Sequence, residues 1–343
     1  MKSRANREVE LFLREAESRW SCLDSVTGHL HRMLERRVRA GQLVSPLPRL
    51  YARAELWAQL TPTLRTIHLV RGLQMLHPTW VFCGTTAAVM HGLDVSWGIQ
   101  EPIEFSSPSG RSATADPRIV RRYVSGDSPV EVGGVRVTSL PRTLLDCMRR
   151  LGLREGLAVA DSALHHGLIT QDDLLAYVGE RHRGMKGIQE ARLIARMADP
   201  RPQNGMESIA RAVMHELGFA APDLQAPFED PMNPGRIYYV DFRWVLPDGS
   251  LVVGELDGGE KYANPLMSGG SPEVAMRRER RRESRISIER PRIVRFTPED
   301  VEDVAYFNRL LETFGVPRDH EPIIEVPEEP VSELVPVEAY GLA

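Results

Sequence analysis

With 343 residues, the chain is longer than a single hydrophobic core usually serves, so we expect two or three domains. Its 42% apolar and 26% charged residues are typical of a globular protein, and no apolar run approaches the roughly 18 residues of a membrane-spanning helix. The net charge of −4 combines two arginine-rich stretches with an acidic tail, so it excludes no class of partner by itself.

The N-terminus and the cysteines indicate the compartment. The first twenty residues carry charges throughout, unlike a signal peptide. Cys22, Cys83 and Cys147 are far apart and form no CxxC pair, which is typical of reduced thiols and argues against a thiolate zinc site. We therefore expect a cytoplasmic protein without a membrane partner.

Apolar spacing in residues 1–60 predicts short helices followed by a hairpin. In the first helix we expect a broad apolar face, formed by Val9, Leu11, Leu13 and Ala16. The second helix, which Gly41 is expected to cap, has apolar residues at helical spacing: Leu30, Met33, Leu34 and Val38. The stretch after Gly41 is short, apolar and interrupted by proline, as a small hairpin would be.

The opposite face of the second helix is basic. It carries Arg32, Arg36 and Arg39. A helix with an arginine face followed by a hairpin is how a winged helix-turn-helix presents itself to DNA, so residues 1–60 are a candidate DNA-binding domain. The alternative interpretation is a small helical domain whose basic face is only solvated.

Residues 61–198 predict a mixed α/β middle domain. Residues 79–93 indicate a strand, a glycine turn and a helix. Residues 132–152 indicate a strand, a turn at Ser139–Pro141 and an amphipathic helix. Two further helices, separated by Gly167, follow. No residue of this region can be assigned a chemical role.

A break rich in proline, asparagine and glycine at 198–205 marks a domain boundary, and we place a third domain at 199–316. It opens with a helix whose apolar residues form one stripe: Met206, Ile209, Ala210, Val213, Met214 and Leu217. The remaining segment, 317–343, is an acidic, proline-rich tail without periodicity, so we expect it to be disordered.

Two strands in the third domain bring carboxylates together. Asp241 lies on the polar face of an alternating strand, and Glu255 and Asp257 project from one face of the next. Between the strands, Pro247–Gly249 suits a three-residue hairpin loop. That loop sets Leu246 opposite Ser250 and Asp241 opposite Glu255, so the three acids are expected to converge.

Three carboxylates in one place repel one another unless a cation lies between them. Oxygen-only ligands favour a hard ion such as Mg²⁺ or Mn²⁺, and we expect Asp241, Glu255 and Asp257 to bind one. The chemistry that suits such a site is phosphodiester hydrolysis, in which the metal activates water and stabilises charge on the phosphate.

Residues 199–316 resemble the PD-(D/E)XK nucleases and, more narrowly, a bacterial family related to very-short-patch-repair (Vsr) endonucleases. The resemblance is carried by "VDFRWVLPDGSLVVGELDGGEKY", an arginine-rich helix and "RIVRFTPEDV". It implies a restriction-endonuclease-like α/β domain with a central mixed sheet. It also implies metal-binding roles for Asp241 and Glu255 and matches Glu207 to the catalytic acid of the first helix.

Asp257 is the main departure from that family, because it stands where the parent motif has its catalytic lysine. We keep Asp257 as a candidate catalytic residue, and Lys261 would reach back toward the scissile phosphate if the chain turns at Gly258–Gly259. The helix after the motif carries candidate phosphate contacts at Arg277, Arg280 and Arg281.

Several of these residues also have a purely structural interpretation. Glu207, three residues after Asn204, has the spacing of a capping box. Asp241 fits a half-exposed strand, and the arginine run fits a solvated helix with i,i+4 ion pairs.

The N-terminal two thirds carry a second resemblance. "LERRVRAGQLVSPLPRLYAR", "GTTAAVMHGL" and "VTSLPRTLLDC" are similar to the AbiEi-type antitoxins of abortive-infection toxin–antitoxin systems. The resemblance implies a winged helix that binds promoter DNA and represses transcription, and a cognate toxin or a second copy of the chain as partner.

Two functions therefore compete for this α/β multidomain chain. The leading hypothesis is a DNA-binding protein with a Mg²⁺- or Mn²⁺-dependent endonuclease domain. The alternative is an antitoxin-type regulator whose nuclease fold is inactive, which the missing lysine at position 257 favours.

Overall fold

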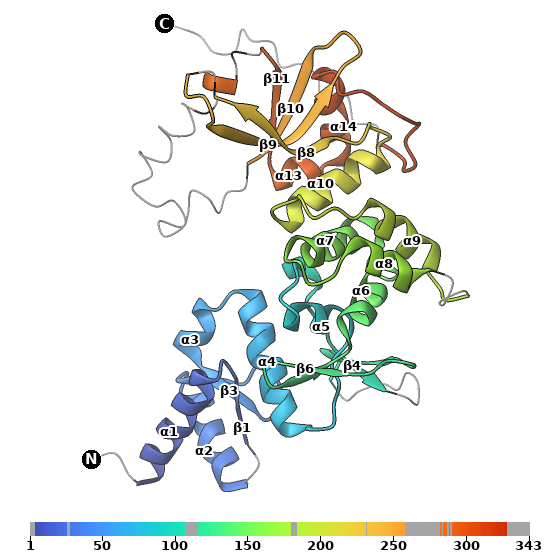
Figure 1. Ribbon diagram of the computed structural model, residues 1–343. Helices are drawn as coiled ribbons and strands as arrows, with labels where there is room; N and C mark the ends of the chain where they lie inside the picture. Colours follow the sequence, from blue (N-terminus) through green and yellow to red (C-terminus); the bar gives the residue numbers. More distant parts are fainter. Residues whose placement is uncertain are drawn as a thin grey trace, which may run out of the picture. The chain divides into compact units, whose positions relative to one another are not determined.

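The computed structural model describes residues 4–25, 28–107, 116–179, 184–230, 232–257, 282, 284–286, 288 and 290–327. It is a mixed α/β protein with several sheets, and the chain forms two compact units, Met1–Gly205 and Met206–Ala343 (Figure 1). We call them the N-terminal and the C-terminal unit. Four candidate residues lie outside the described residues: Lys261, Arg277, Arg280 and Arg281. Within the part of the chain that the structure describes, the helices are too short or too polar for a bilayer span.

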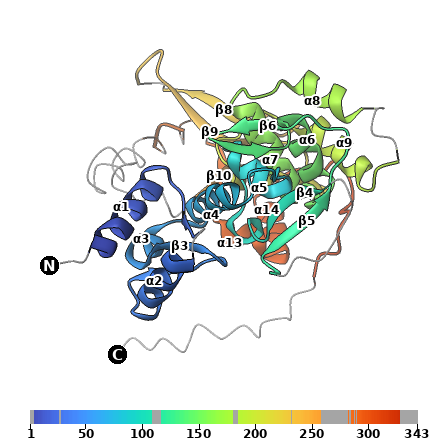
Figure 2. The ribbon, with the colours of Figure 1, turned by 90° about the horizontal axis from the view of Figure 1, so that it is seen from below.

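The N-terminal unit opens with two helices and a small sheet. Its first elements are α1 (Arg4–Ser18), β1 (Leu23–Asp24), α2 (Gly28–Arg39), β2 (Leu43–Val44), β3 (Leu50–Arg53) and α3 (Ala54–Gln59). The two helices and the hairpin lie where the sequence predicts them. The strands form an antiparallel sheet in the order β1-β3-β2, and Figure 2 shows α1, α2 and α3 gathered around β3.

The apolar face predicted for α1 is partly wrong. Val9 and Leu13 are buried, but Leu11 is 64% exposed, and half-buried Phe12 packs against the core instead. Residues three and four apart share a helix face, so Phe12 aligns with Val9 and Ala16 while Leu11 points elsewhere. The apolar face of α2 is confirmed, because Met33 and Leu34 are buried in the same cluster.

The rest of the N-terminal unit follows the prediction in part: the helix after Gly84, the strand and helix of residues 132–152 and the two helices around Gly167 are present, whereas the strand predicted before Gly84 is reduced to isolated bridges at Phe82. Its elements are α4 (Pro62–Leu76), α5 (Gly84–Met90), β4 (Ile103–Ser107), β5 (Ile119–Tyr123), β6 (Val130–Val132), β7 (Val135–Val137), α6 (Leu140–Met148), α7 (Gly152–His165), α8 (Gln171–Val178) and α9 (Ile188–Met197). β4 pairs with β5 in parallel, and β6 with β7 antiparallel. Gly167, at φ 64°, separates α7 from α8.

A buried ion cluster lies in this unit. Glu104 of β4 is 3% exposed, and its Oε1 accepts hydrogen bonds of 2.6 Å from Arg122 and from Arg150. Its Oε2 accepts from the backbone N–H of Thr85, 3.3 Å away. Gly84, at φ 56°, permits this approach, because a Cβ at that position would collide with Oε2. No local pattern predicts this cluster, because its members are distant in the chain.

His68 makes the stability of the N-terminal unit depend on pH. The residue is 3% exposed, and burial lowers its pKa, opposed by a hydrogen bond to the Ser21 backbone and aided by the charge of Arg71. Since the folded-state pKa lies below the unfolded value of about 6.5, the unfolded chain binds the proton first as pH falls. The stabilisation is therefore complete above about pH 6.5 and decreases below it.

We expect the free energy of unfolding to decrease as the pH is lowered from about 7.5 to about 5.5. His68 contributes up to about 1.4 kcal/mol of this decrease per pH unit. Urea denaturation at both pH values measures it. His68→Gln should make the dependence shallower, since burial also lowers the pKa values of His77 and His91, whereas His166→Gln, at an exposed position, should leave it unchanged. An equal pH dependence in all three proteins would contradict the role of His68.

The C-terminal unit is a four-stranded mixed sheet with helices packed on it. Its elements are α10 (Gly205–Glu216), β8 (Asp223–Glu229), β9 (Ile237–Val245), β10 (Leu251–Leu256), β11 (Arg292–Phe296), α13 (Pro298–Glu302) and α14 (Val304–Thr313). The strand order is β11-β10-β9-β8, with β11 parallel to β10 and the other pairs antiparallel. A mixed sheet is what the sequence predicts.

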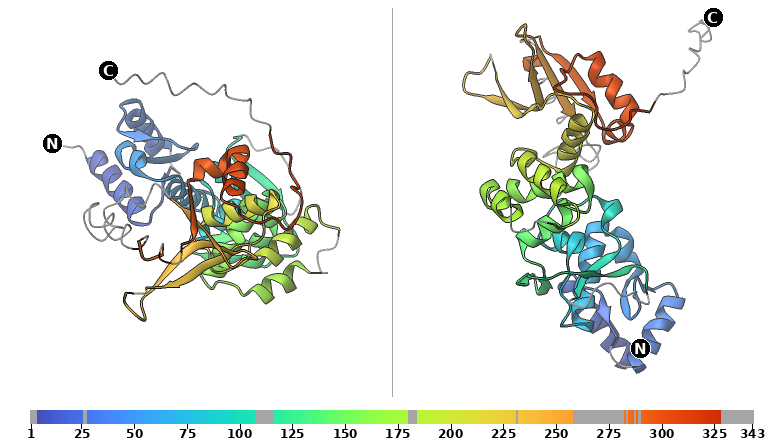
Figure 3. Two further views of the ribbon diagram at one scale, coloured as in Figure 1. Left: turned by 90° about the horizontal axis from the view of Figure 1, so that it is seen from above. Right: turned by 90° about the vertical axis from the view of Figure 1, so that its right-hand side faces the viewer.

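The core of this unit lies between the sheet and the helices, which lie beside the strands in both views of Figure 3. Val213 of α10 and Phe307 of α14 are fully buried against Phe242 of β9 and Phe296 of β11. The apolar stripe predicted for residues 206–217 is confirmed, since its residues belong to this cluster.

The predicted hairpin register is confirmed. The Leu246 N–H donates to the Ser250 carbonyl at 2.8 Å, and Gly249 takes a left-handed conformation with φ 80°. The pairing continues to Phe242 opposite Gly254, so the next pair along the ladder is Asp241 and Glu255. Side chains of directly opposed residues start about 5 Å apart at Cβ, which makes these two acids neighbours.

Part of the tail predicted to be disordered is packed. Ile324 and Val326 contact the core of the C-terminal unit, and the Ile323 N–H donates to the Glu216 carbonyl at 2.9 Å. Arg318 stacks on Phe219, 4.2 Å from the ring centroid. The prediction of disorder for 317–327 was based on the absence of periodicity and is wrong. An extended segment that packs on a helix end needs only scattered apolar residues, without a regular spacing.

Candidate functional site

Carboxylates from three elements lie near the end of the β9–β10 ladder. α10 supplies Glu207, β9 supplies Asp241 and β10 supplies Glu255. Glu207 is 3% exposed and Glu255 is 7% exposed, while Asp241 is half-buried. Burying a charged group costs free energy unless a partner compensates it, so the partners of each carboxylate define what this site is.

Gln225 of β8 joins two of the acids. Its Nε2 donates to Glu207 Oε2 at 3.1 Å and to Asp241 Oδ1 at 3.2 Å. The other oxygen of Asp241 accepts the backbone N–H of Leu256 at 2.9 Å, which fixes the carboxylate against β10. The bridge therefore ties α10, β8, β9 and β10 together at one point.

The backbone of Gln225 is in an unfavourable conformation. Its φ is 47°, in the left-handed region that a residue with a side chain rarely adopts inside a strand. Such a conformation costs about 1–3 kcal/mol and persists only where the surroundings enforce it. Strain of this kind is concentrated at functional sites, and here it coincides with the contact between the two acids.

Glu255 is held by an arginine. Arg282 donates from Nη1 to Glu255 Oε1 at 3.1 Å and from Nη2 to Oε2 at 2.9 Å, a two-bond arrangement. Its Nη1 also lies 2.9 Å from the Tyr239 carbonyl. A guanidinium thus supplies the positive charge that the buried Glu255 requires.

Asp257 has different surroundings from the other acids. It is 40% exposed at the side chain, and Arg295 of β11 forms an ion pair with it at 3.2 Å. Its backbone N–H donates to the Phe296 carbonyl at 2.9 Å. Asp257 therefore lies at the edge of the carboxylate group, where β10 and β11 end.

The expected convergence of Asp241, Glu255 and Asp257 on one ion is not found. Among the described residues, no three histidine, cysteine, aspartate or glutamate side chains are placed to share a metal ion. The reason is that separate partners hold the acids: Gln225 and the Leu256 N–H hold Asp241, Arg282 holds Glu255, and Arg295 holds Asp257.

The candidate DNA-binding arginines of α2 are on the surface. Arg32, Arg36 and Arg39 are all exposed, on the side of the helix opposite buried Met33 and Leu34. The neighbouring Arg37 instead pairs with Glu10 of α1 at 2.7 Å. The basic face predicted from the sequence is therefore present, whereas Arg37 joins the two helices.

Sequence reasoning missed Gln225 and Arg282. Gln225 is one polar residue in a strand of alternating polar and apolar residues. The residues next to it in the sequence do not indicate a contact with acids 16 or more residues away. Arg282 belongs to the arginine run already noted, but the candidates chosen there were Arg277, Arg280 and Arg281. Its partner Glu255 is 27 residues away.

Comparison with known proteins gives relatives without an assigned activity. The chain is similar to two uncharacterized proteins, one from each of two strains of Mycobacterium tuberculosis. Each is 32% identical over 185 residues, which cover 54% of this chain and 65% of the relative's own length. No family model matches the chain, and no solved structure matches it.

Proposed function

We propose that this protein binds DNA through a winged helix formed by residues 1–60 and hydrolyses phosphodiester bonds with a restriction-endonuclease-like C-terminal unit. The observation that carries the proposal is the Gln225 bridge. A strained strand residue holds buried Glu207 against Asp241, directly beside buried Glu255. A merely structural sheet end would not need three acids and a strained backbone at one point.

The donor chemistry fits Mg²⁺ or Mn²⁺, because carboxylate oxygens are the ligands that hard divalent ions prefer. We propose that Asp241 and Glu255 hold the ion. When bound, it supplies charge stabilisation at the phosphate and a water of lowered pKa. Arg282 neutralises Glu255 in the structure, and its guanidinium is suited to contact a phosphate oxygen instead.

Incubation of supercoiled plasmid with the protein tests this function. With Mg²⁺ or Mn²⁺ we expect nicked and linear products, and none when the divalent ions are chelated. Plasmid that stays intact with every divalent ion, on supercoiled and single-stranded DNA and on RNA, would contradict a nuclease.

One set of contacts favours a second function, an antitoxin-type transcriptional regulator with an inactive nuclease fold. Arg282 and Arg295 already neutralise Glu255 and Asp257, so these acids need no metal ion to be stable. In that case the C-terminal unit binds nucleic acid, a cognate toxin or a second copy of the chain. Specific promoter binding without cleavage would support the regulator.

Both functions predict that the arginine face of α2 contacts DNA. We expect Arg36→Ala to weaken binding to the gene's own promoter about tenfold and to lower the salt dependence by about one counterion. Electrophoretic mobility shift at several salt concentrations measures both quantities. Arg14→Ala is the matched control, because Arg14 is an equally exposed arginine on α1. Equal affinity of Arg36→Ala and the wild type for the promoter would contradict a contact between α2 and DNA.

A further inference from the structure

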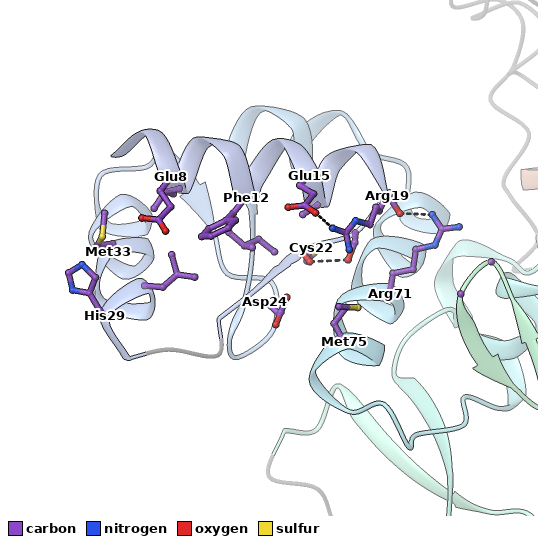
Figure 4. A pocket seen from close by; sticks show the side chains of 17 residues that line it. Glu8, Phe12, Glu15, Arg19, Cys22, Asp24, His29, Met33, Arg71 and Met75 are labelled. Atoms are coloured by element: carbon purple, nitrogen blue, oxygen red, sulfur yellow. Dashed lines mark hydrogen bonds and ion pairs between the residues drawn. The ribbon is translucent and has the colours of Figure 1, made fainter. Parts of the chain in front are cut away.

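A cavity of about 610 Å³ lies in the N-terminal unit, far in sequence from the acids of the C-terminal unit. α1, β1, α2 and the end of α4 form its walls, and Gly133 and Gly134 close one side. Figure 4 shows Glu8 and Phe12 projecting from α1, His29 and Met33 from α2, and Met75 from α4. Cavities of this size hold small organic ligands.

The walls of the cavity are largely apolar. They include Val9, Phe12, Leu23, Leu30, Met33 and Met75. Met75 is 57% exposed and lies at the edge, so apolar surface continues from the interior to the mouth. Methionine and phenylalanine adapt to ligands of varied shape, and an aromatic ring also attracts cations.

The charges around the cavity are not balanced. Glu15 pairs with Arg19, which neutralises both. Glu8 and Asp24 line the cavity, and within the described residues neither side chain has a hydrogen bond or an ion pair. Exposed Glu8 and half-buried Asp24 thus face an apolar space with no counterion among the described side chains.

Among the described residues, the cationic groups nearby do not compensate these acids. Arg71 is at the α4 end, where its Nη1 donates to the Arg19 carbonyl at 2.8 Å (Figure 4). His29 is on α2 and is exposed. The charges of Glu15 and Arg19 cancel. The described lining then has two negative charges, from Glu8 and Asp24, and one positive charge, from Arg71, so the net charge is negative.

We propose that this cavity binds a small organic cation with an apolar body, such as an arylalkyl amine. The ammonium group pairs with one of the two carboxylates, Glu8 or Asp24, and the apolar body packs on Phe12, Leu30 and Met33. An anion of the same shape is disfavoured, because it would meet two uncompensated carboxylates. Binding at this site does not depend on the proposed function.

The position of the site on α2 has a consequence that rests on the proposed function. α2 contributes His29, Leu30 and Met33 to the cavity, and its opposite face carries the arginines proposed to contact DNA. α2 therefore lies between this cavity and the face proposed to contact DNA.

Three probes with one skeleton test the proposal: 4-phenylbutylamine, 4-phenylbutyrate and 4-phenylbutanol. Calorimetric titration of the full-length protein should show the amine binding about tenfold more tightly than the carboxylate, with the alcohol between them. The double variant Glu8→Gln, Asp24→Asn should lose this preference while its affinity for the alcohol stays the same. That unchanged affinity shows that the cavity is intact.

Glu55→Gln is the matched control, since it removes one exposed carboxylate of the same unit away from the cavity and should keep the preference for the amine. The proposal is overturned if the amine does not bind, if the three probes bind equally, or if the double variant still prefers the amine.

Discussion

Replacing Asp241 by asparagine is expected to reduce plasmid cleavage at least ~100-fold, because a metal ligand supplies several kcal/mol of charge stabilisation at the reacting phosphate. Asparagine has nearly the same shape and keeps an oxygen that accepts the Leu256 N–H. The amide nitrogen cannot accept the hydrogen bond from Gln225 Nε2, so we expect a loss of about 1 kcal/mol in the free energy of unfolding, while the hairpin stays in register.

Glu255→Gln is expected to have a similar effect on cleavage, since it removes the second proposed ligand but leaves a side chain that fits the same space. Glu302→Gln is the control, because Glu302 is an exposed carboxylate on α13 of the same unit. The measurement is the initial rate of nicking at saturating Mg²⁺. Cleavage that survives both Asp241→Asn and Glu255→Gln would place the activity elsewhere or in a contaminant.

The second large effect concerns stability. Glu104→Ala is expected to destabilise the N-terminal unit by about 3–5 kcal/mol, because removing one partner of a buried ion pair leaves the other charge without compensation. Here two guanidinium groups, Arg122 and Arg150, lose the same carboxylate. Because the Arg122 and Arg150 side chains are 28% and 25% exposed, water compensates part of their charge, and the loss should lie toward the lower end of this range.

Urea denaturation followed by tryptophan fluorescence measures this loss. Trp80 is a suitable reporter, since it stacks on Phe105, the neighbour of Glu104, with ring centroids 3.9 Å apart. Glu131→Gln, an exposed carboxylate on β6, is the control and should change the free energy of unfolding by less than about 0.5 kcal/mol. A loss below about 1 kcal/mol for Glu104→Ala would mean that the two arginines find other partners.

Local patterns in the sequence predicted several of the elements. The β9–β10 register followed from the length of the Pro247–Gly249 loop, and helical spacing located α2 and α10, because each of these signals is contained in a few neighbouring residues. The prediction that Leu11 is buried was wrong, because residues two apart, such as Leu11 and Leu13, were assigned to the same helix face. The packing of 317–327 was missed because it depends on a distant helix end.

The partners of the acids could not be predicted in the same way. The sequence indicated that Asp241 and Glu255 lie side by side, since register alone decides this. Whether a metal ion, an amide or an arginine neutralises them depends on Gln225 in β8 and on Arg282 beyond β10. Those contacts arise from tertiary packing, which leaves no local pattern.

Calorimetric titration of Mn²⁺ into metal-free protein tests the central claim most directly. We expect one saturable site in the wild type and in Glu302→Gln, and no binding in the Asp241→Asn, Glu255→Gln double variant. Binding of Mn²⁺ by the double variant as tightly as by the wild type, or no binding by the wild type, would contradict a metal-dependent site at Asp241 and Glu255.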